Sequence, residues 1–332
     1  MLIFFIFLFS LATFASGLVV SFATLLLVRA LMAAAEGPVI PLVQSTLLDE
    51  SSVKRRGLNM GVVQSASSLL GGALAPIIVI GLAIAFDWRT AFYVIAIPGF
   101  IVGLILWKYM REPRTTAENT AKPTKKEYLQ IFKTRNIWLG MIMMTCNMMW
   151  LTTLMAFIPT FLANMTDNTD GINSILLAVL GFMMFVGQMV GPAVSDKVGR
   201  KPVLYVSSFI AIFLPIAITI FYNNFTLLLI SMAFFALGNA YQPLLIAIIP
   251  GESVPRIFAA SAISAIILVG EAIGATAGPI FGGILADQFS LFAPFWVVAG
   301  AGIIAFLCSF GMKETAPVKT RVDSDDKASI VS

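Results

Sequence analysis

Ten apolar segments follow one another along this chain, and each is near the length that a helix needs to cross a bilayer. Hydrophobic residues make up 59% of the 332 positions and charged residues only 11%, whereas about a quarter of a soluble domain is charged. We therefore expect an all-α membrane protein. The segments are 2–19, 22–48, 57–86, 90–110, 136–163, 175–195, 202–222, 225–249, 257–286 and 291–312.

Lysine and arginine are strongly biased toward alternate connections between these segments. Arg89 is the one cation in the other set of connections, Arg29 lies within a segment, and the rest of the 21 fall on the first side. Cytoplasmic loops carry such an excess of positive charge. We therefore expect a multi-pass protein with both termini in the cytoplasm. The short loops fit the plasma (bacterial inner) membrane.

One long polar stretch, 111–135, interrupts the series and separates four apolar segments from six. Its basic character predicts a cytoplasmic linker. Residues 1–110 would then form an incomplete N-terminal bundle of four spans, and 136–314 a C-terminal bundle of six. The polar stretch 315–332 is expected to be a disordered cytoplasmic tail.

A charged loop joins the segments that end near 195 and begin at 202. It holds Asp196, Gly199, Arg200 and Lys201 within G-Q-M-V-G-P-A-V-S-D-K-V-G-R-K. Glycine permits a turn that a side chain would strain, and an acid at a helix end can meet the positive N-terminus of a neighbouring helix. The loop is therefore either an ordinary basic connection that sets topology or a site of contact between helices.

The segment D-K-V-G-R-K resembles the loop motif G-x-L-a-D-r-x-G-r-k of the major facilitator superfamily, although Pro192 stands where the family has glycine. The resemblance implies a major facilitator fold, in which two pseudo-repeat helix bundles rock about a central site. It also implies that Asp196, Gly199, Arg200 and Lys201 form a cytoplasmic gate, which closes through ion pairs in one of two transport states.

An internal repeat agrees with two related bundles. Thr24-Leu-Leu-Leu27 recurs as Thr226-Leu-Leu-Leu229, and Pro41-Leu42 as Pro243-Leu244, both at an offset of 202 residues. Parallel repeats of this kind relate the two halves of major facilitator transporters. At an offset of 202 residues, the first residue of the chain corresponds to a position just after the charged loop in the second half. We therefore expect ten transmembrane helices of the family's twelve. The first two spans and the first loop copy would be missing, as in a fragment, a misplaced start or a decayed gene.

Three ionisable residues lie within apolar segments, where such residues are expensive and suggest function. Arg29 and Glu36 are seven positions apart, so they share one helical face about two turns apart. Arg29 resembles the arginine of the family's fourth span, which is implicated in proton coupling or in holding an anionic group; otherwise it locks helices together. Glu36 either takes part in binding the substrate or a proton, or it lies at a kink of the helix. Glu271 either binds a proton or makes a polar contact between helices.

Uncharged polar side chains within the segments are further candidates for a central cavity, although they more often bond helix to helix. Among them we select Asn147, Trp150, Gln188 and Asn239 as substrate-contacting residues. The whole set is Gln44, Gln64, Asn147, Trp150, Gln188, Asn239, Tyr241 and Gln242.

These features together predict a secondary active transporter of a small organic solute that works by alternating access. The sequence has no G-x-x-x-x-G-K-[ST] nucleotide motif, so an ion gradient, most simply of protons, would drive it. A small organic anion suits Arg29. The pattern Glu252-Ser-Val-Pro255 with Glu271, and Pro159-Thr-Phe-Leu162 at the end of the fifth segment, resemble the superfamily's organic-anion symporters. A lipophilic drug suits the sparse charge. Expected partners are the solute, protons and membrane lipid, and not nucleic acid. No cofactor or metal is expected, since histidine is absent and both cysteines lie in apolar segments.

Other classes of function remain open. A truncated remnant or an accessory membrane protein would follow from the loss of two spans. A drug/proton antiporter would carry G-x-x-x-G-P-x-x-G in the fifth span of the family. Here the corresponding stretch, 71–76, has alanine at one glycine, and the full pattern lies at 274–282 in the other half. A membrane-embedded enzyme would need paired acids or a Ser–Lys arrangement within spans, and the sequence shows neither. We expect no enzyme.

Overall fold

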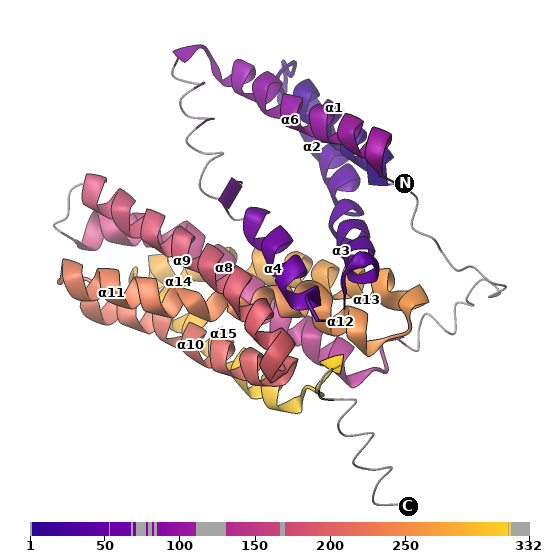
Figure 1. The fold of residues 1–332 in the computed structure, drawn as a ribbon. Coiled ribbons are helices and arrows are strands. Elements are labelled where there is room, and N and C mark those ends of the chain that lie inside the picture. The colour runs from indigo at the N-terminus through magenta and orange to yellow at the C-terminus, as the bar shows by residue number, and fades with distance from the viewer. Residues whose placement is uncertain are drawn as a thin grey trace, which may run out of the picture. The chain divides into compact units, whose positions relative to one another are not determined.

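The structure is a computed structural model that describes residues 2–52, 54–67, 69–70, 78, 82, 85–110, 131–166, 170–317 and 319. Every regular element in these residues is a helix, as the apolar segments predict (Figure 1). The chain divides into two compact units. The first is Met1–Thr46 with Leu70–Pro123, and the second is Leu47–Leu69 with Thr124–Ser332.

Eight helices in the described residues are long and apolar enough to cross a membrane. Two expected segments are not among them. Segment 2–19 corresponds to α1 (Leu2–Ser16), an apolar helix of 15 residues, and segment 57–86 includes positions outside the described residues. Ten spans therefore stay a prediction. The eight are Phe22–Glu50, Trp88–Tyr109, Arg135–Met165, Gly171–Val198, Arg200–Phe221, Phe225–Ser253, Arg256–Gln288 and Ala293–Gly311.

The predicted domain boundaries cannot be read directly from the two units. Most of the linker 111–135 and of the tail 315–332 lies outside the described residues, and so does the stretch 71–76. Residues 47–69 belong to the second unit because α4 packs against α9. The division into bundles of four and six spans stays a prediction.

The first unit is built around the contact of α1 with α2 and α6. Ser21 and Thr24 form a capping box that starts α2. The helices α1 and α6 approach closely, since a Cβ on Gly99 would overlap Ser10 Oγ and Tyr93 Oη donates to the carbonyl of Gly17 at 2.9 Å. The helices are α1, α2 (Phe22–Glu36), the first part of α3 (Val39–Glu50) and α6 (Trp88–Tyr109).

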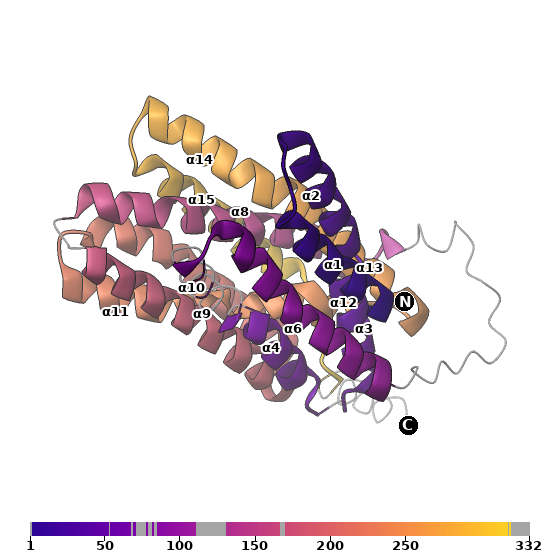
Figure 2. The same ribbon diagram turned by 90° about the horizontal axis from the view of Figure 1, so that it is seen from above.

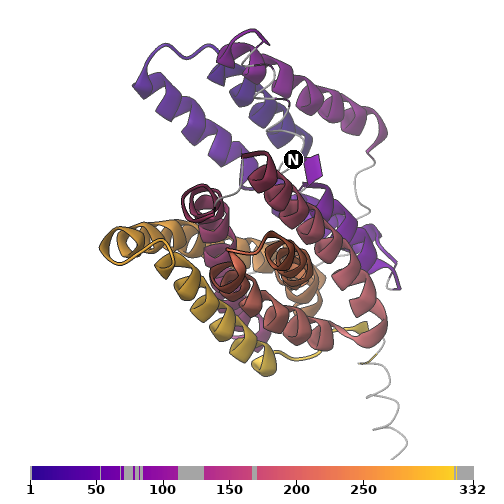
Figure 3. The same ribbon diagram turned by 90° about the vertical axis from the view of Figure 1, so that its left-hand side faces the viewer.

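The second unit is a bundle in which α8 packs against both α14 and α15, side by side in Figure 2. Figure 3 shows several of its helices nearly end-on. The span Phe225–Ser253 is the most buried of the eight, with 78% of an 18-residue stretch inside the protein. The elements are α4 (Arg56–Ser67), α8 (Arg135–Met165), α9 (Asp170–Val198), α10 (Arg200–Phe221), α11 (Phe225–Ala236), η2 (Leu237–Tyr241), η3 (Leu244–Ile248), α12 (Ile249–Ser253), α13 (Arg256–Val269), η4 (Gly270–Ala275), α14 (Thr276–Gln288) and α15 (Ala293–Gly311).

Two spans of this unit change helical form midway. The span that begins with α11 passes through a 3₁₀ segment, η2, and a π segment, η3, before α12. Pro243 between them has no backbone N–H, so a regular α-helical bond is lost there. Gly238 lies so close to the backbone of Ala211 in α10 that a Cβ would overlap it. The second span has a π segment, η4, between α13 and α14. Such irregular segments within helices often mark hinges or functional sites.

Four glycines at four-residue spacing line one side of the span formed by α13, η4 and α14. They bring its backbone against α8. A Cβ on Gly274 would overlap the carbonyl oxygen of Thr145, and one on Gly278 would stand 2.5 Å from Thr153 Oγ1. Small residues permit this close approach of membrane helices. The glycines are Gly270, Gly274, Gly278 and Gly282.

We predict that Gly274→Ala destabilises the protein, whereas Gly283→Ala does not. The first Cβ meets a backbone carbonyl that cannot rotate away, and the second meets nothing within 4 Å. Overpacking of this kind costs about 1–3 kcal/mol. The midpoint of thermal unfolding in detergent measures the difference. Equal midpoints for the two variants would contradict a tight seam between η4 and α8.

Candidate functional site

A cluster of four amide side chains lies buried inside the second unit. Asn147 Nδ2 donates to Asn239 Oδ1 at 3.0 Å. Gln242 Oε1 accepts from Asn239 Nδ2 at 3.1 Å and from Gln188 Nε2 at 2.7 Å. The four side chains are at most 5% exposed. This amide cluster links α8, α9 and the span that begins with α11.

The irregular backbone places two members of the amide cluster. Asn239 lies in the 3₁₀ segment η2, and Gln242 lies just before Pro243. Three of the residues predicted to contact substrate, Asn147, Gln188 and Asn239, lie together in this cluster, and Gln242 was not among those selected. Its position three residues after Asn239, next to a proline within a span, is the signal that could have identified it.

Trp150, the fourth selected residue, has a different environment. Its indole Nε1 donates to the backbone carbonyl of Ala211 at 3.0 Å, and the side chain is fully buried. This bond ties α8 to α10. The geometry therefore gives Trp150 a packing role in the conformation seen here.

Two buried side-chain oxygens on α8 have no hydrogen-bond partner among the described residues, Asn147 Oδ1 and Thr153 Oγ1. A buried polar atom without a partner costs about 1–3 kcal/mol. Asn147 Oδ1 belongs to the amide cluster, so it can accept a hydrogen bond from a hydroxyl group that enters there. The cluster is uncharged, and it offers both donors and acceptors.

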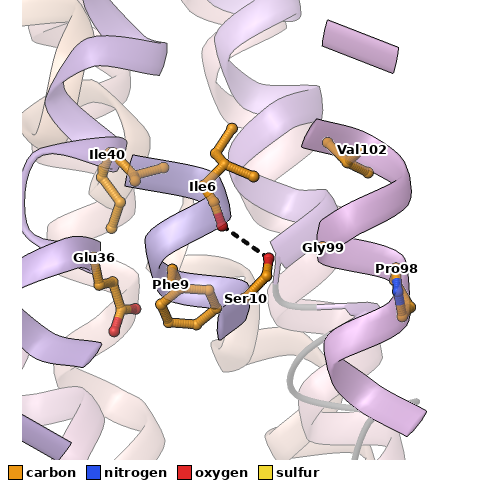
Figure 4. Close-up of a pocket in the computed structure, with 9 residues that line it drawn as sticks. Ile6, Phe9, Ser10, Glu36, Ile40, Pro98, Gly99 and Val102 are labelled. Carbon is orange, nitrogen blue, oxygen red and sulfur yellow. Dashed lines mark hydrogen bonds between the residues drawn. The ribbon is translucent and has the colours of Figure 1, made fainter. Parts of the chain in front are cut away.

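Arg29 and Glu36 both lie on α2 in the first unit, as their spacing predicts, and both are exposed. The guanidinium of Arg29 lies 5.7 Å from the centre of the Phe92 ring, within the range of a cation–π contact. Glu36 lines an otherwise largely apolar pocket of about 350 Å³ in this unit. Figure 4 shows it across the pocket from Pro98 and Val102.

Glu271, the third ionisable residue within a span, lies in the π segment η4 of the second unit. Its side chain is exposed. Gly270 and Gly274 on either side are buried against α8. These glycine contacts therefore belong to the seam with α8.

Asp196 of the charged loop caps a neighbouring helix, as an acid at a helix end can. Its two carboxylate oxygens accept from the backbone N–H groups of Gly57 at 2.9 Å and Leu58 at 3.0 Å. These N–H groups lie at the start of α4, where the helix dipole is positive. The two helices approach closely at this point, and the absence of a side chain on Gly57 permits it. A Cβ on Gly57 would overlap the carbonyl oxygen of Pro192.

Arg200 joins this contact to a second acid. Its Nη1 lies 2.7 Å from Asp196 Oδ1, and its Nε and Nη2 donate to the two oxygens of Glu252 at 3.2 and 3.1 Å. Arg56 Nη1 reaches Glu252 Oε1 at 3.5 Å. The side chains of Arg200, Asp196 and Glu252 are at most 5% exposed. We call Arg56, Asp196, Arg200 and Glu252 the buried charge cluster.

The two remaining residues of the loop motif hold the start of α10. Gly199 has φ +105°, so it adopts the turn conformation that glycine permits. Glu314 then accepts from the backbone N–H groups of Arg200 at 2.8 Å and Lys201 at 3.1 Å. Lys201 Nζ donates to the carbonyl of Phe310 at 3.0 Å. The segment after α15 is thereby fastened to the loop.

These contacts add residues that the sequence analysis did not select, namely Arg56, Glu252 and Glu314. Glu252 opens the stretch Glu252-Ser-Val-Pro-Arg256, which repeats Glu50-Ser-Ser-Val-Lys-Arg55 at an offset of 202 to 201 residues, and Arg56 directly follows the first copy. This repeat was the available signal. In the described part of the chain, no three cysteine or acidic side chains are grouped to hold a metal ion.

A family model described as the Major Facilitator Superfamily matches residues 1–264 and 153–332. The chain belongs to the major facilitator superfamily. It is therefore an integral, multi-pass membrane protein of a transporter family and not an enzyme.

Two curated relatives are named as sugar-acid transporters. The Hexuronate transporter of Bacillus subtilis (strain 168) is 26% identical over 208 residues, which cover 59% of this chain and 49% of that protein. The Probable L-galactonate transporter of Escherichia coli (strain K12) is 26% identical over 256 residues, which cover 68% and 55%. The chain thus spans about half the length of the curated relatives it matches.

The fold is similar to that of the solved transporter FucP in its outward conformation. The TM-score is 0.76 at 13% sequence identity, and the match covers 94% of this chain and 82% of that one. At this identity the likeness concerns the fold alone.

We predict that Asp196→Asn loosens α4 from the charged loop. The variant loses the carboxylate that accepts from two N–H groups and from Arg200, and a charged hydrogen bond is worth about 1.5–3 kcal/mol. Met60 in α4 is 1% exposed, so a Met60→Cys side chain should react with a polar maleimide roughly ten-fold faster in the Asp196→Asn background. Cys146 and Cys308 are replaced by serine in every sample.

The control for this experiment is Asp287→Asn, which removes an exposed acid from α14. It should leave the labelling rate of Met60→Cys unchanged. An unchanged rate in Asp196→Asn would contradict the role of Asp196 in holding the start of α4.

Proposed function

We propose that this protein is a secondary active transporter of a small carboxylated sugar, driven by a proton gradient through alternating access. The observation that carries the proposal is the amide cluster, where Asn147 Oδ1 has no partner among the described residues and lies beside a 3₁₀ segment within a span. Uncharged hydrogen-bond donors and acceptors that are buried within spans suit the hydroxyl groups of a sugar. The names of the two curated relatives support this class of solute.

The charged residues have separate proposed roles. Arg29, a cation within a span of the first unit, would hold an anionic group. Glu36, on the wall of a largely apolar pocket, would take up and release the coupling proton. Glu271 is a second candidate for the proton. The buried charge cluster, with Gly199 and Lys201, would close the cytoplasmic side.

The proposal includes a topology of ten spans in two pseudo-repeat bundles with both termini in the cytoplasm. The bias of lysine and arginine toward one set of connections supports it. A bacterial inner membrane is the proposed location.

The test is uptake by proteoliposomes that contain the purified chain alone. Labelled glucuronate and L-galactonate are the probes, xylose is the neutral control, and an inside-alkaline pH gradient is imposed with or without a protonophore. Saturable uptake of a sugar acid that collapses with the protonophore is expected. Uptake that ignores the gradient would overturn proton coupling. No saturable uptake of any probe would favour a non-transporting remnant or accessory protein.

A drug/proton antiporter is the second candidate, because the pocket beside Glu36 is largely apolar and carries one acid. Such a site suits a lipophilic cation. Proton-driven movement of a lipophilic cation such as tetraphenylphosphonium, with no movement of sugar acids, would favour it over the leading proposal.

We predict that Asn147→Ala lowers the uptake of sugar acid about ten-fold. It removes a contact to the solute and leaves Asn239 without its donor, which together cost about 1–3 kcal/mol. The matched control is Asn164→Ala on the same helix, whose exposed side chain donates to the backbone carbonyl of Thr160 one turn earlier. Initial uptake rates in proteoliposomes measure both. Equal rates in the two variants would remove the amide cluster from the binding site.

We also predict that Arg29→Gln raises the KM for a sugar acid by roughly ten- to a hundred-fold, since a charge-assisted hydrogen bond is worth about 1.5–3 kcal/mol. Arg89→Gln is the control. Arg89 also lies over an aromatic ring, that of Trp88, but it lies outside the expected path of the substrate. It should leave KM unchanged. A normal KM in Arg29→Gln would show that Arg29 only joins helices.

A further inference from the structure

Three cations gather at the C-terminal end of α15, apart from the buried charge cluster. Lys201 Nζ lies 3.0 Å from the carbonyl oxygen of Phe310, and the guanidinium of Arg135, at the start of α8, lies beside Gly311. Lys313 follows two residues later. We call Arg135, Lys201 and Lys313 the α15 cation corner.

The backbone around Lys313 is fixed. The buried side chain of Asn136 accepts from the N–H of Lys313 at 2.8 Å and donates to its carbonyl oxygen at 3.2 Å. Asn136 also donates to Ser253 Oγ at 2.9 Å, which ties this corner to the end of α12. The position of Lys313 is therefore set by buried contacts.

The three cations have no ion-pair partner among the described residues. The acid next in sequence, Glu314, directs its carboxylate toward backbone N–H groups, those of Arg200, Lys201, Thr315 and Ala316. The side chains of Arg135 and Lys313 are exposed. Their hydrogen-bond donors therefore remain available to an anion at this surface.

An apolar surface leads away from the cation corner along α10 and α15, which pack side by side (Figure 1). Phe310 is 54% exposed and stacks on Tyr205, with ring centres 5.9 Å apart. Phe209 and Leu307 farther along the two helices are also exposed. In a membrane protein this face meets acyl chains, so one ligand could place its chains here and its charge at the corner.

We propose that the α15 cation corner binds the phosphate group of an anionic phospholipid, whose acyl chains lie along α10 and α15. The charges are complementary, and basic sites between transmembrane helices bind such headgroups. Lysine and arginine also occur at helix C-termini simply because the dipole is negative there. The dipole alone predicts no preference for an anionic over a zwitterionic lipid. The two explanations therefore predict different relative affinities for these two kinds of lipid.

The experiment is native mass spectrometry of the purified full chain, titrated with phosphatidylglycerol or with phosphatidylcholine. The unmodified protein should bind one phosphatidylglycerol more tightly than phosphatidylcholine. Arg135→Gln with Lys313→Gln should weaken phosphatidylglycerol binding roughly 25-fold, about five-fold for each cation. Arg135→Lys with Lys313→Arg keeps both charges and should retain at least half of the preference.

The matched control is Lys108→Gln with Arg256→Gln, which also removes one lysine and one arginine, both exposed. It should bind phosphatidylglycerol as the unmodified protein does. An equal loss in the control would overturn the proposal in favour of overall charge. So would displacement of the lipid by millimolar inorganic phosphate, which would indicate a site for a soluble anion. A monodisperse elution profile shows that each variant is folded.

Discussion

The second unit depends on the burial of an arginine. Arg200 is 1% exposed, and a guanidinium at that depth requires partners because the loss of hydration costs several kcal/mol. Asp196 and Glu252 supply them, and each acid has further donors of its own. Satisfying one buried cation thus draws together α4, α9, α10, α12 and the segment after α15.

Two of the spans that meet at Arg200, α9 and the span that begins with α11, also meet at the amide cluster. Helix α9 carries Gln188 and Asp196, eight residues or about 12 Å apart along its axis. The span that begins with α11 carries Gln242 and Glu252, ten residues apart. A shift between these two spans that separates Gln188 from Gln242 therefore also strains the link from Asp196 through Arg200 to Glu252. The irregular segment η3 lies between Gln242 and Glu252 along this span, where such a shift could be absorbed.

The sequence predicted the elements that depend on composition and short motifs. Apolar segments identified the helices, and the loop motif identified Asp196, Gly199 and Arg200, whose close contacts the structure then supplied. It did not predict their partners. The N–H groups of Gly57 and Leu58 carry no side-chain signal, since every residue except proline has one. Glu314 stands one residue before a stretch expected to be a disordered tail, yet its carboxylate holds the start of α10.

For polar residues within spans, the sequence likewise identifies the residue type but not its hydrogen-bond partner. Asn147 and Trp150 lie about one turn apart on α8, and both carry a polar side-chain atom within the same apolar segment. Their neighbours decide their roles. The indole N–H of Trp150 is used by the carbonyl of Ala211, whereas Asn147 retains an oxygen without a partner among the described residues. A sequence motif lists donors and acceptors, but only the packing of α8 against α10 and η2 shows which of them are already used.

The buried charge cluster also constrains what any open state must look like. Separating Asp196 from α4 would leave a carboxylate and the first N–H groups of a helix without partners. A charge without a partner cannot remain in a dry interior at an acceptable free energy, so water must replace the lost contacts. An open conformation on this side is therefore a hydrated one. In the proposed gate, closure would expel that water, and the mutual bonds of Asp196, Arg200 and Glu252 would offset most of the cost. Large opposing terms with a small difference would allow the two proposed conformations a similar free energy.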